Sequence, residues 1–129
     1  MQATDIIRSG IVRKDALLSV PKPCFIKDGK SLLRIFKEHV VCILSDGHVC
    51  QIHLKGKRTP ILIYDTFKKL TAKFSDILVT IHRGTAVNMQ YATAIENGAV
   101  TLTWDDNKRD FSYSAEGYKR ILEAIDLIQ

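Results

Sequence analysis

Short apolar runs separated by glycine-containing pairs are the feature that most limits the folds open to this sequence. Three of these pairs are Asp28-Gly29, Asp46-Gly47 and Asn97-Gly98. Because glycine accepts a positive φ at little cost, such pairs favour the tight turns that join antiparallel strands. The pattern therefore predicts a mostly β domain in which hairpins connect neighbouring strands.

The apolar runs themselves predict about eight to ten short strands. They lie at residues 24–27, 32–36, 40–44, 48–54, 59–64, 78–82, 92–96 and 100–104, with a short run ending at residue 88 and a last strand around residues 111–113. Residues 40–44 are almost continuously apolar and β-branched, which indicates a strand covered on both faces.

Two segments have the apolar spacing of short amphipathic helices. Thr66 is placed to cap a helix over residues 66–74. The apolar face of this helix would comprise Phe67, Leu70 and Phe74, and its wet face Lys68, Lys69 and Lys73. Ser114 is placed to cap a final helix. The apolar stripe of that helix would comprise Tyr118, Ile121, Leu122, Ile125 and Ile128.

The chain of 129 residues has the size of one domain. Pro21 and Pro23 mark the entry to its strand-rich part. We expect residues 1–22 to be an N-terminal extension or linker and residues 23–129 to be the folded domain. The sequence leaves open whether residues 1–20 form an arm, a linker or part of a dimer contact.

Charge and cysteine usage narrow the class of protein. The formal net charge is +5, which fits a polyanionic partner without requiring one. The three cysteines, Cys24, Cys42 and Cys50, lie in apolar runs without the close spacing of a metal site. We interpret them as reduced, buried thiols of a cytoplasmic protein.

Other classes of function find no support in the sequence. No apolar run approaches the roughly 18 residues that span a membrane, and the N-terminus has no apolar leader. Phosphate-loop, nucleophile-elbow and metalloprotease motifs are absent. We therefore expect no membrane association, no enzyme activity, no cofactor and no small-molecule ligand.

The segment at residues 78–88 carries the main functional signal. An apolar strand runs into His82 and Arg83, and a small-residue turn and a second apolar run follow. A guanidinium at the junction of a strand and a loop suits a phosphate or a guanine edge, because its five donors lie in one plane. The segment resembles the signature F-x-R-x-H-R-S-x-x-V-N of the LytTR family of bacterial DNA-binding domains.

The resemblance extends over residues 24–127. Residues 25–29 look like the first hairpin of the family, and residues 40–48 resemble its segment I-x-Y-I-E-A-x-G-N-Y. Residues 66–70 resemble its S/T-L-K-x-L helix, and residues 111–114 resemble the strand that leads into its last helix. The resemblance implies an elongated arrangement of small antiparallel sheets with a C-terminal helix, whose loops enter successive major grooves of DNA.

Three loop regions carry the DNA contacts of this family, and the resemblance places His48, Arg83 and Ser114 in them. His82 lies beside Arg83 and is a further candidate. Phosphate contacts would come from the lysines of the helix at residues 66–74 and from a basic turn. The residues of the basic turn are Lys55, Lys57 and Arg58.

The sequence departs from the family pattern at three places. Thr80 stands where the family usually has arginine, and Gly84 where it has serine. Ser114 is followed by Ala115 and Glu116, whereas the family has an arginine there. Loss of a bidentate arginine contact costs about 1–3 kcal/mol, so we expect weaker or altered binding at this loop.

Each candidate residue also has a structural interpretation. Arg83 could pair with a carboxylate such as Asp76, and His48 could be an ordinary turn residue. The basic turn could simply be solvated. His82 could be a structural histidine, and Asn88 is interpreted as a turn residue that binds its own backbone.

We interpret the chain as a sequence-selective, double-stranded DNA-binding domain of bacterial transcription regulation, of the kind found as the output of two-component response regulators. Binding would weaken steeply with salt, and a homodimer could bind paired repeats on bent DNA. The alternative is a protein-interaction module of the same fold that has lost DNA binding, with the N-terminal segment and residues 125–128 as its contact surface. Binding of single-stranded RNA is disfavoured because no strand carries clustered aromatic residues.

Overall fold

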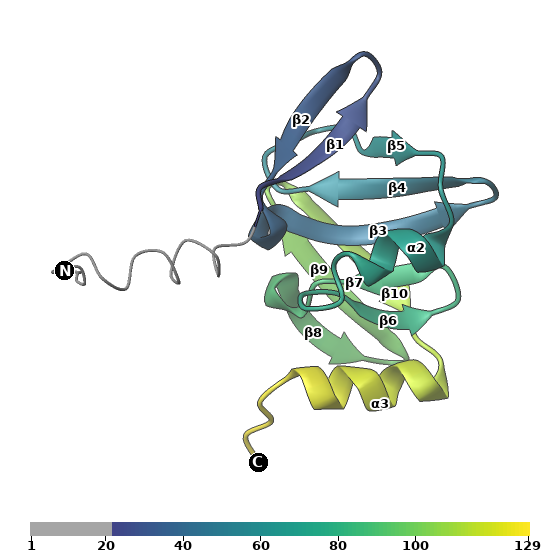
Figure 1. Ribbon diagram of the computed structural model, residues 1–129. Coiled ribbons are helices and arrows are strands. Elements are labelled where there is room, and N and C mark those ends of the chain that lie inside the picture. Colours follow the sequence, from purple (N-terminus) through teal and green to yellow (C-terminus); the bar gives the residue numbers. More distant parts are fainter. Residues whose placement is uncertain (1–21) are drawn as a thin grey trace, which may run out of the picture.

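Ten strands, two α-helices and two 3-10 helices make up residues 22–129, the part of the chain that this computed structural model describes (Figure 1). The strands form three antiparallel sheets. The smallest sheet is a hairpin of β1 (Cys24–Asp28) and β2 (Ser31–Ile35). The arrangement confirms the prediction of a mostly β domain built from small antiparallel sheets with a C-terminal helix.

The largest sheet has five strands in the order β5-β4-β3-β7-β6. Its strands are β3 (Val40–Asp46), β4 (Val49–Leu54), β5 (Ile61–Ile63), β6 (Val79–His82) and β7 (Thr85–Val87). The strand expected at residues 59–64 is shorter than predicted. The predicted run that ends at Asn88 is the strand β7.

The third sheet has three strands in the order β10-β9-β8. Its strands are β8 (Ala92–Glu96), β9 (Ala99–Trp104) and β10 (Asn107–Ser112). The helices are η1 (Lys37–His39), α2 (Phe67–Ala72), η2 (Met89–Tyr91) and α3 (Ala115–Ala124). No helix within residues 22–129 is long and apolar enough to cross a membrane.

The central strand β3 is buried on both faces, as its apolar run predicts. Val40 and Ile43 belong to one hydrophobic core, and Val41 and Cys42 belong to another. Adjacent residues of a regular strand point to opposite faces. Val41 and Cys42 share a core because the register between β3 and β4 shifts between Val40 and Cys42. This β-bulge lets one strand contribute to both cores.

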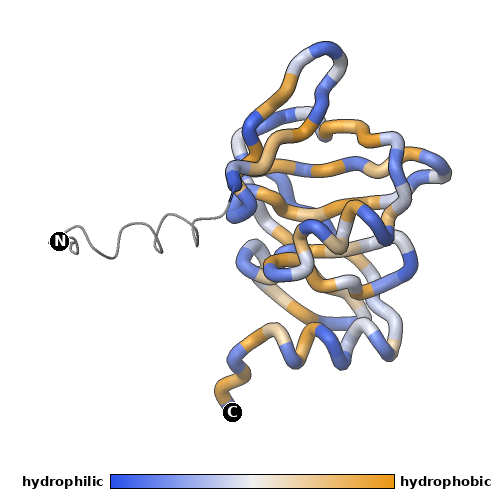
Figure 2. The backbone as a smooth tube through the Cα atoms, viewed as in Figure 1, coloured by the Kyte–Doolittle hydropathy of each residue, from blue (hydrophilic) through white to orange (hydrophobic). Residues whose placement is uncertain are grey.

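The two cores lie on opposite faces of the five-stranded sheet. The first packs α2 and the β1–β2 hairpin against one face, through residues such as Ile26, Leu70 and Phe74. The second packs the three-stranded sheet and α3 against the other face, through residues such as Leu102 and Ile121. Figure 2 shows long hydrophobic stretches along the central strands, whereas the turns after β1 and β3 are hydrophilic.

The predicted turn at Asn97-Gly98 is confirmed, and its two central residues adopt positive φ angles. Asn97 has φ 53° and Gly98 has φ 77°, so both central residues of the β8–β9 turn occupy the left-handed region. This is the conformation for which an Asn-Gly pair is favoured in two-residue hairpins. Gly29 and Gly47 also have positive φ in the turns that follow β1 and β3.

The apolar stripe predicted for the last helix is wrong in its extent. The helix ends at Ala124, so Ile125 and Ile128 lie beyond it. Ile121 is fully buried, but Tyr118 and Leu122 are 41% and 38% exposed. Gly117, which is buried and lacks a side chain, lets the helix lie close to Ile81 of β6. The predicted helix at residues 66–74 is likewise shorter, but Thr66 caps it as expected.

The last strand also differs from its prediction around Phe111 and Tyr113. It begins at Asn107 and pairs along its whole length with β9. Its first four residues are polar and exposed because β10 is an edge strand. The N-terminal extension predicted at residues 1–22 lies, apart from residue 22, outside the described residues.

Candidate nucleic-acid interface

Three of the predicted contact regions lie along one edge of the molecule. They are the turn at residues 46–48, the turn at residues 83–84 and the start of α3 at residues 114–116, which together we call the loop edge (Figure 1, right side). In the sheet, β3 lies between β4 and β7, so the turn after β3 and the turn before β7 are neighbours. Two backbone hydrogen bonds connect the three regions.

The first of these bonds joins the two turns. The backbone N–H of Ser45, near the end of β3, donates to the carbonyl oxygen of Gly84 at 2.8 Å. Arg83 and Gly84 form a two-residue turn between the paired residues His82 and Thr85. Gly84 has φ +74°, and a Cβ placed on it would lie 3.2 Å from the Cβ of Ser45. The glycine that replaces the family's serine therefore suits both the conformation and the close approach.

The second bond joins the start of α3 to β6. The register of β6 shifts between Thr80 and His82, so Ile81 is a bulged residue. The carbonyl oxygen of Ile81 accepts the backbone N–H of Ser114 at 2.9 Å. A Cβ placed on Gly117 would lie 1.9 Å from this same oxygen. The bulge and the glycine together let the first turn of α3 lie directly on the strand that precedes Arg83.

Arg83 is exposed at the tip of the β6–β7 turn. The proposed structural pair with Asp76 is not what the structure shows, because Asp76 instead lies 3.5 Å from the Nζ of Lys37. That pair is the one ion pair within the described part of the chain. Among residues 22–129, no carboxylate pairs with the guanidinium of Arg83.

The two histidines of the loop edge are also exposed. His48 lies at the tip of the β3–β4 turn and lines a shallow pocket of about 570 Å³ with Tyr64 and Asp65. The exposed side chain of His82 forms no hydrogen bond with other described residues, which argues against a buried structural role. Tyr64 is 79% exposed. Sequence reasoning missed its exposure because an aromatic residue at the end of an apolar strand is expected to be buried.

Ser114 uses its side chain to hold α3. Its Oγ accepts the backbone N–H of Gly117 at 2.9 Å, which confirms the predicted cap. The same hydroxyl lies 3.4 Å from the carbonyl oxygen of Ile81. Glu116, in the first turn of the helix, is exposed. The anionic side chain faces solvent beside the cap.

The basic turn of residues 55–58 lies at the other end of the sheet. The backbone N–H of Lys55 donates to His39 at 2.8 Å, and that of Gly56 donates to Oδ2 of Asp105 at 2.8 Å. The six residues of β4 separate this turn from His48, a distance of about 20 Å. The structure thus brings His48, His82, Arg83 and Ser114 to one edge but leaves Lys55, Lys57 and Arg58 away from them.

Asn88 combines the predicted turn role with one that sequence reasoning missed. Its Oδ1 accepts the backbone N–H of Gln90 at 3.0 Å, as expected of a turn asparagine. Its Nδ2 donates to the carbonyl oxygen of Val40 at 2.9 Å. Asn88 is only 2% exposed. The buried amide therefore ties β7 to the start of β3.

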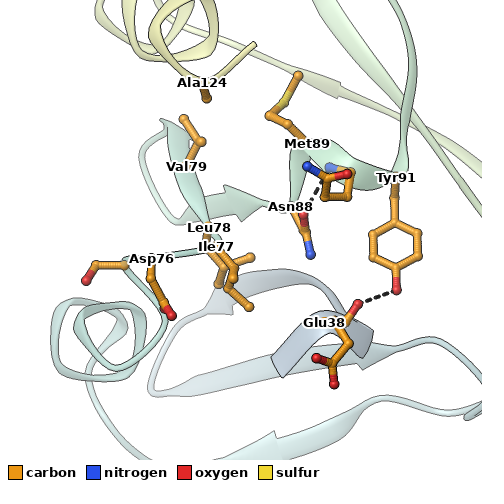
Figure 3. A pocket seen from close by; sticks show the side chains of 11 residues that line it. Glu38, Asp76, Ile77, Leu78, Val79, Asn88, Met89, Tyr91 and Ala124 are labelled. Atoms are coloured by element: carbon orange, nitrogen blue, oxygen red, sulfur yellow. Dashed lines mark hydrogen bonds between the residues drawn. The ribbon is translucent and has the colours of Figure 1, made fainter. Parts of the chain in front are cut away.

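A pocket of about 610 Å³ lies beside Asn88, at the edge opposite to the loop edge (Figure 3). Its rim carries the carboxylates of Glu38 and Asp76. The hydroxyl of Tyr91 donates to the carbonyl oxygen of Glu38 at 2.6 Å and closes one side. Two carboxylates without a basic lining residue make this pocket unsuited to the phosphates of DNA.

The cysteines offer no reactive site at the interface. Burial raises the pKa of the Cys42 thiol to about 12. Burial, followed by the nearby Asp65 carboxylate, also raises the pKa of Cys50. Both thiols are buried as predicted, whereas Cys24 is half-buried. No group of His, Cys, Asp and Glu residues within residues 22–129 could hold a metal ion.

Comparison with known proteins agrees with this geometry. The model of the LytTr DNA-binding domain family matches residues 30–126, and the chain belongs to this family. It is therefore a member of a DNA-binding family, as the signature at residues 78–88 indicates. No curated protein matches the chain.

A solved structure has a similar fold. It is the LytTr DNA-binding domain of a protein described as a methyl-accepting/DNA response regulator from Bacillus cereus. The TM-score is 0.60, and the match covers 82% of this chain and 100% of the solved one at 14% sequence identity. At this identity the similarity concerns the fold, and it confirms the predicted arrangement of small sheets with a C-terminal helix.

Proposed function

We propose that this protein binds double-stranded DNA with sequence selectivity and regulates bacterial transcription as the output domain of a response regulator. The observation that carries the proposal is the backbone bond between Ser45 and Gly84. It holds the turns of His48 and Arg83 side by side while both side chains remain exposed. Two adjacent loops with free polar tips suit entry into a major groove about 12 Å wide.

The residues of the loop edge take different roles in this proposal. Arg83 reads a guanine through a bidentate contact, and His48 contacts a neighbouring base edge. His82 lies beside Arg83 and contacts phosphate. The hydroxyl of Ser114 is engaged in capping α3, so we place Ser114 at the phosphate rim, where it positions the helix and does not read bases.

The basic turn of Lys55, Lys57 and Arg58 contributes less directly. It is about 20 Å from His48 along β4, which exceeds the Debye length of about 8 Å at physiological salt. We propose that its charges attract DNA during approach and contact phosphates only on a duplex that bends toward them. A substitution there should affect affinity much less than one at Arg83.

A fluorescence-anisotropy titration tests the proposal. A randomised duplex pool at roughly 50 and 200 mM salt establishes binding and its salt dependence, and a duplex selected from the pool then compares variants. Arg83→Ala should weaken binding about 10- to 100-fold, since a bidentate base contact contributes about 1–3 kcal/mol. Arg58→Ala removes the same side chain at the distant turn and should change affinity less than about threefold. Absence of binding by the wild type at both salt concentrations would contradict the proposal.

The second candidate function is a protein-interaction module of the same fold. Exposed apolar side chains favour it: Leu32 on β2 is 70% exposed, and Ile128, in the predicted contact surface of residues 125–128, is 91% exposed. The N-terminal segment, the other part of this surface, lies outside the described residues. The same titration distinguishes the two functions, because an interaction module would not bind the duplex pool and Arg83→Ala would have no effect.

The titration also tests whether the protein binds paired repeats as a homodimer. A homodimer would show a Hill coefficient above 1 on a two-site duplex.

A further inference from the structure

A groove crosses β6 between the two helices α2 and α3. It has a volume of about 470 Å³, and Val79 and Thr80 form part of its lining. Its two charged lining residues are Lys68 of α2 and Arg120 of α3. No carboxylate lines it, whereas Glu38, Asp65 or Asp76 lines each of the four other pockets described for residues 22–129. The groove is thus suited to an anion.

Arg120 is oriented over the groove by the backbone of the strand beneath it. Its Nη1 donates to the carbonyl oxygen of Thr80 at 3.2 Å. Guanidinium has five N–H donors, and this bond uses one of them. Both Arg120 and Lys68 are exposed. A planar fork and a mobile ammonium from opposite walls can together surround the oxygens of a phosphate.

The position of the groove along β6 relates it to the base-reading turn. Thr80 precedes Arg83 by three residues, which is about 10 Å along a strand. The major groove of DNA is about 8.5 Å deep. If β6 points into the major groove, this offset would place the groove between α2 and α3 near the height of the phosphate backbone when Arg83 reaches the base edges.

We propose that this groove binds one backbone phosphate of the duplex whose major groove receives the β6–β7 turn. The inference rests on the proposed DNA binding and adds a site to it. A phosphate held by Lys68 and Arg120 limits how deeply Arg83 enters and sets its register along the DNA. The site carries no information about base sequence.

Two double variants with equal loss of charge test the site. Lys68→Gln with Arg120→Gln removes both cations of the groove. Lys30→Gln with Lys119→Gln removes two exposed cations, neither of which lines the groove. The logarithm of the binding constant is measured against the logarithm of salt concentration on the selected duplex. Loss of one phosphate contact should reduce the magnitude of the slope by about 0.9 in the groove variant relative to the control variant.

Specificity gives a second measurement. The groove variant should bind the selected duplex and the random pool more weakly by the same factor, so that the ratio of the two affinities stays at the wild-type value. Arg83→Ala should lower that ratio. A single neutral methylphosphonate moved along the selected duplex should weaken wild-type binding at one position where it has no effect on the groove variant.

The outcomes separate this inference from the proposed function. Equal slopes for the two double variants, with tight wild-type binding, would overturn the phosphate site and leave DNA binding intact. A wild type that binds no duplex would overturn both. Thermal melts of both double variants check that the exposed substitutions leave the fold unchanged, with Tm values expected within about 3 °C of the wild type.

Discussion

The loop edge and the opposite edge lie at the two ends of the strands in the five-stranded sheet, and they differ in how far side chains contribute to the bonds that hold them together. At the loop edge the connections run between backbone atoms, from Ser45 to Gly84 and from Ser114 to Ile81. At the opposite edge, formed by residues 37–40, 55–58, 88–91 and 105, side chains supply connections in addition to the backbone bonds of Lys55 to His39 and of Asn88 to Val41. These side-chain bonds come from Asn88, Tyr91, Asp105 and the pair of Lys37 with Asp76.

This difference separates binding from stability in the molecule. The side chains of His48 and Arg83 can change without loss of the bonds that hold their turns. Substitution of Asn88 or Asp105 removes a connecting bond, because the side chain of each supplies its donor or acceptor. Substitutions at the loop edge should therefore alter DNA binding and leave stability unchanged, and substitutions at the opposite edge should do the reverse.

The largest expected effect is on stability and comes from Gly117, although this residue lies at the loop edge. Gly117→Ala places a Cβ 1.9 Å from the carbonyl oxygen of Ile81, and backbone atoms cannot move aside cheaply. We expect it to lower the free energy of unfolding by about 3 kcal/mol, despite the better helix propensity of alanine. Urea denaturation measures the loss. Lys119→Ala, on the exposed face of the same helix, is the control, and a Gly117→Ala protein as stable as this control would refute the close packing of α3 on β6.

The next effect breaks a buried side-chain bond of the opposite edge. Asn88→Ala removes the donor to the buried carbonyl oxygen of Val40 and leaves that acceptor unsatisfied. Such a loss costs about 1–3 kcal/mol. The denaturation midpoint should fall while the affinity of the folded protein for the selected duplex stays within about twofold. Gln90→Ala, at the exposed neighbour, should change neither quantity.

A smaller effect on stability is expected from Asp105, whose side chain binds the backbone of the turn that carries the basic residues. Asp105→Ala removes the carboxylate that accepts the N–H of Gly56 and places alanine at φ 50°. We expect a loss of about 1 kcal/mol in the free energy of unfolding. Asp105→Asn keeps an acceptor and tolerates this conformation, so it should retain most of the stability. Equal stability of the two variants would show that the bond between the turns contributes little.

The smallest effect is a pH dependence near the opposite edge. Burial, and then the nearby Arg109, lower the pKa of His53 below its ordinary value of 6.5. The unfolded chain therefore binds a proton more readily, and stability that is fully present above pH 6.5 is lost as the pH falls through that value. His53→Gln should flatten the decline in Tm between pH 7 and pH 5 relative to the wild type. Parallel declines in the two proteins would assign the pH dependence to other groups.

Much of the fold follows from local signals in the sequence. The Asn97-Gly98 turn, the caps at Thr66 and Ser114 and the doubly buried run of β3 are each determined by residues a few positions apart. The sequence predicts the last strand too late, because an edge strand such as β10, which begins with exposed polar residues, has no apolar alternation to reveal it. The stripe of the last helix was extended too far because periodicity does not report what covers a helix face.

The candidate site was predictable in part for a similar reason. Arg83 and His48 are found from a motif and from turn positions, and both prove to be exposed at one edge. The predicted strand at residues 48–54 already separates His48 from the basic turn of residues 55–58. What the sequence does not reveal is that the turn of Arg83 lies beside the turn of His48, which follows from the order of strands in the sheet. The roles of Lys68 and Arg120 required the packing of two helices on β6.

The contact between Gly117 and Ile81 has a consequence for how this domain can diversify. A joint made of main-chain atoms has the same shape whatever side chains surround it. Under the proposed function, residues at the tips of the two turns could then be exchanged one at a time, and each exchange would alter which bases are preferred without tilting the helix or the neighbouring turn. Through its contact with Ile81, Gly117 keeps the start of α3 aligned with the strand that precedes Arg83, whatever side chains the turns carry.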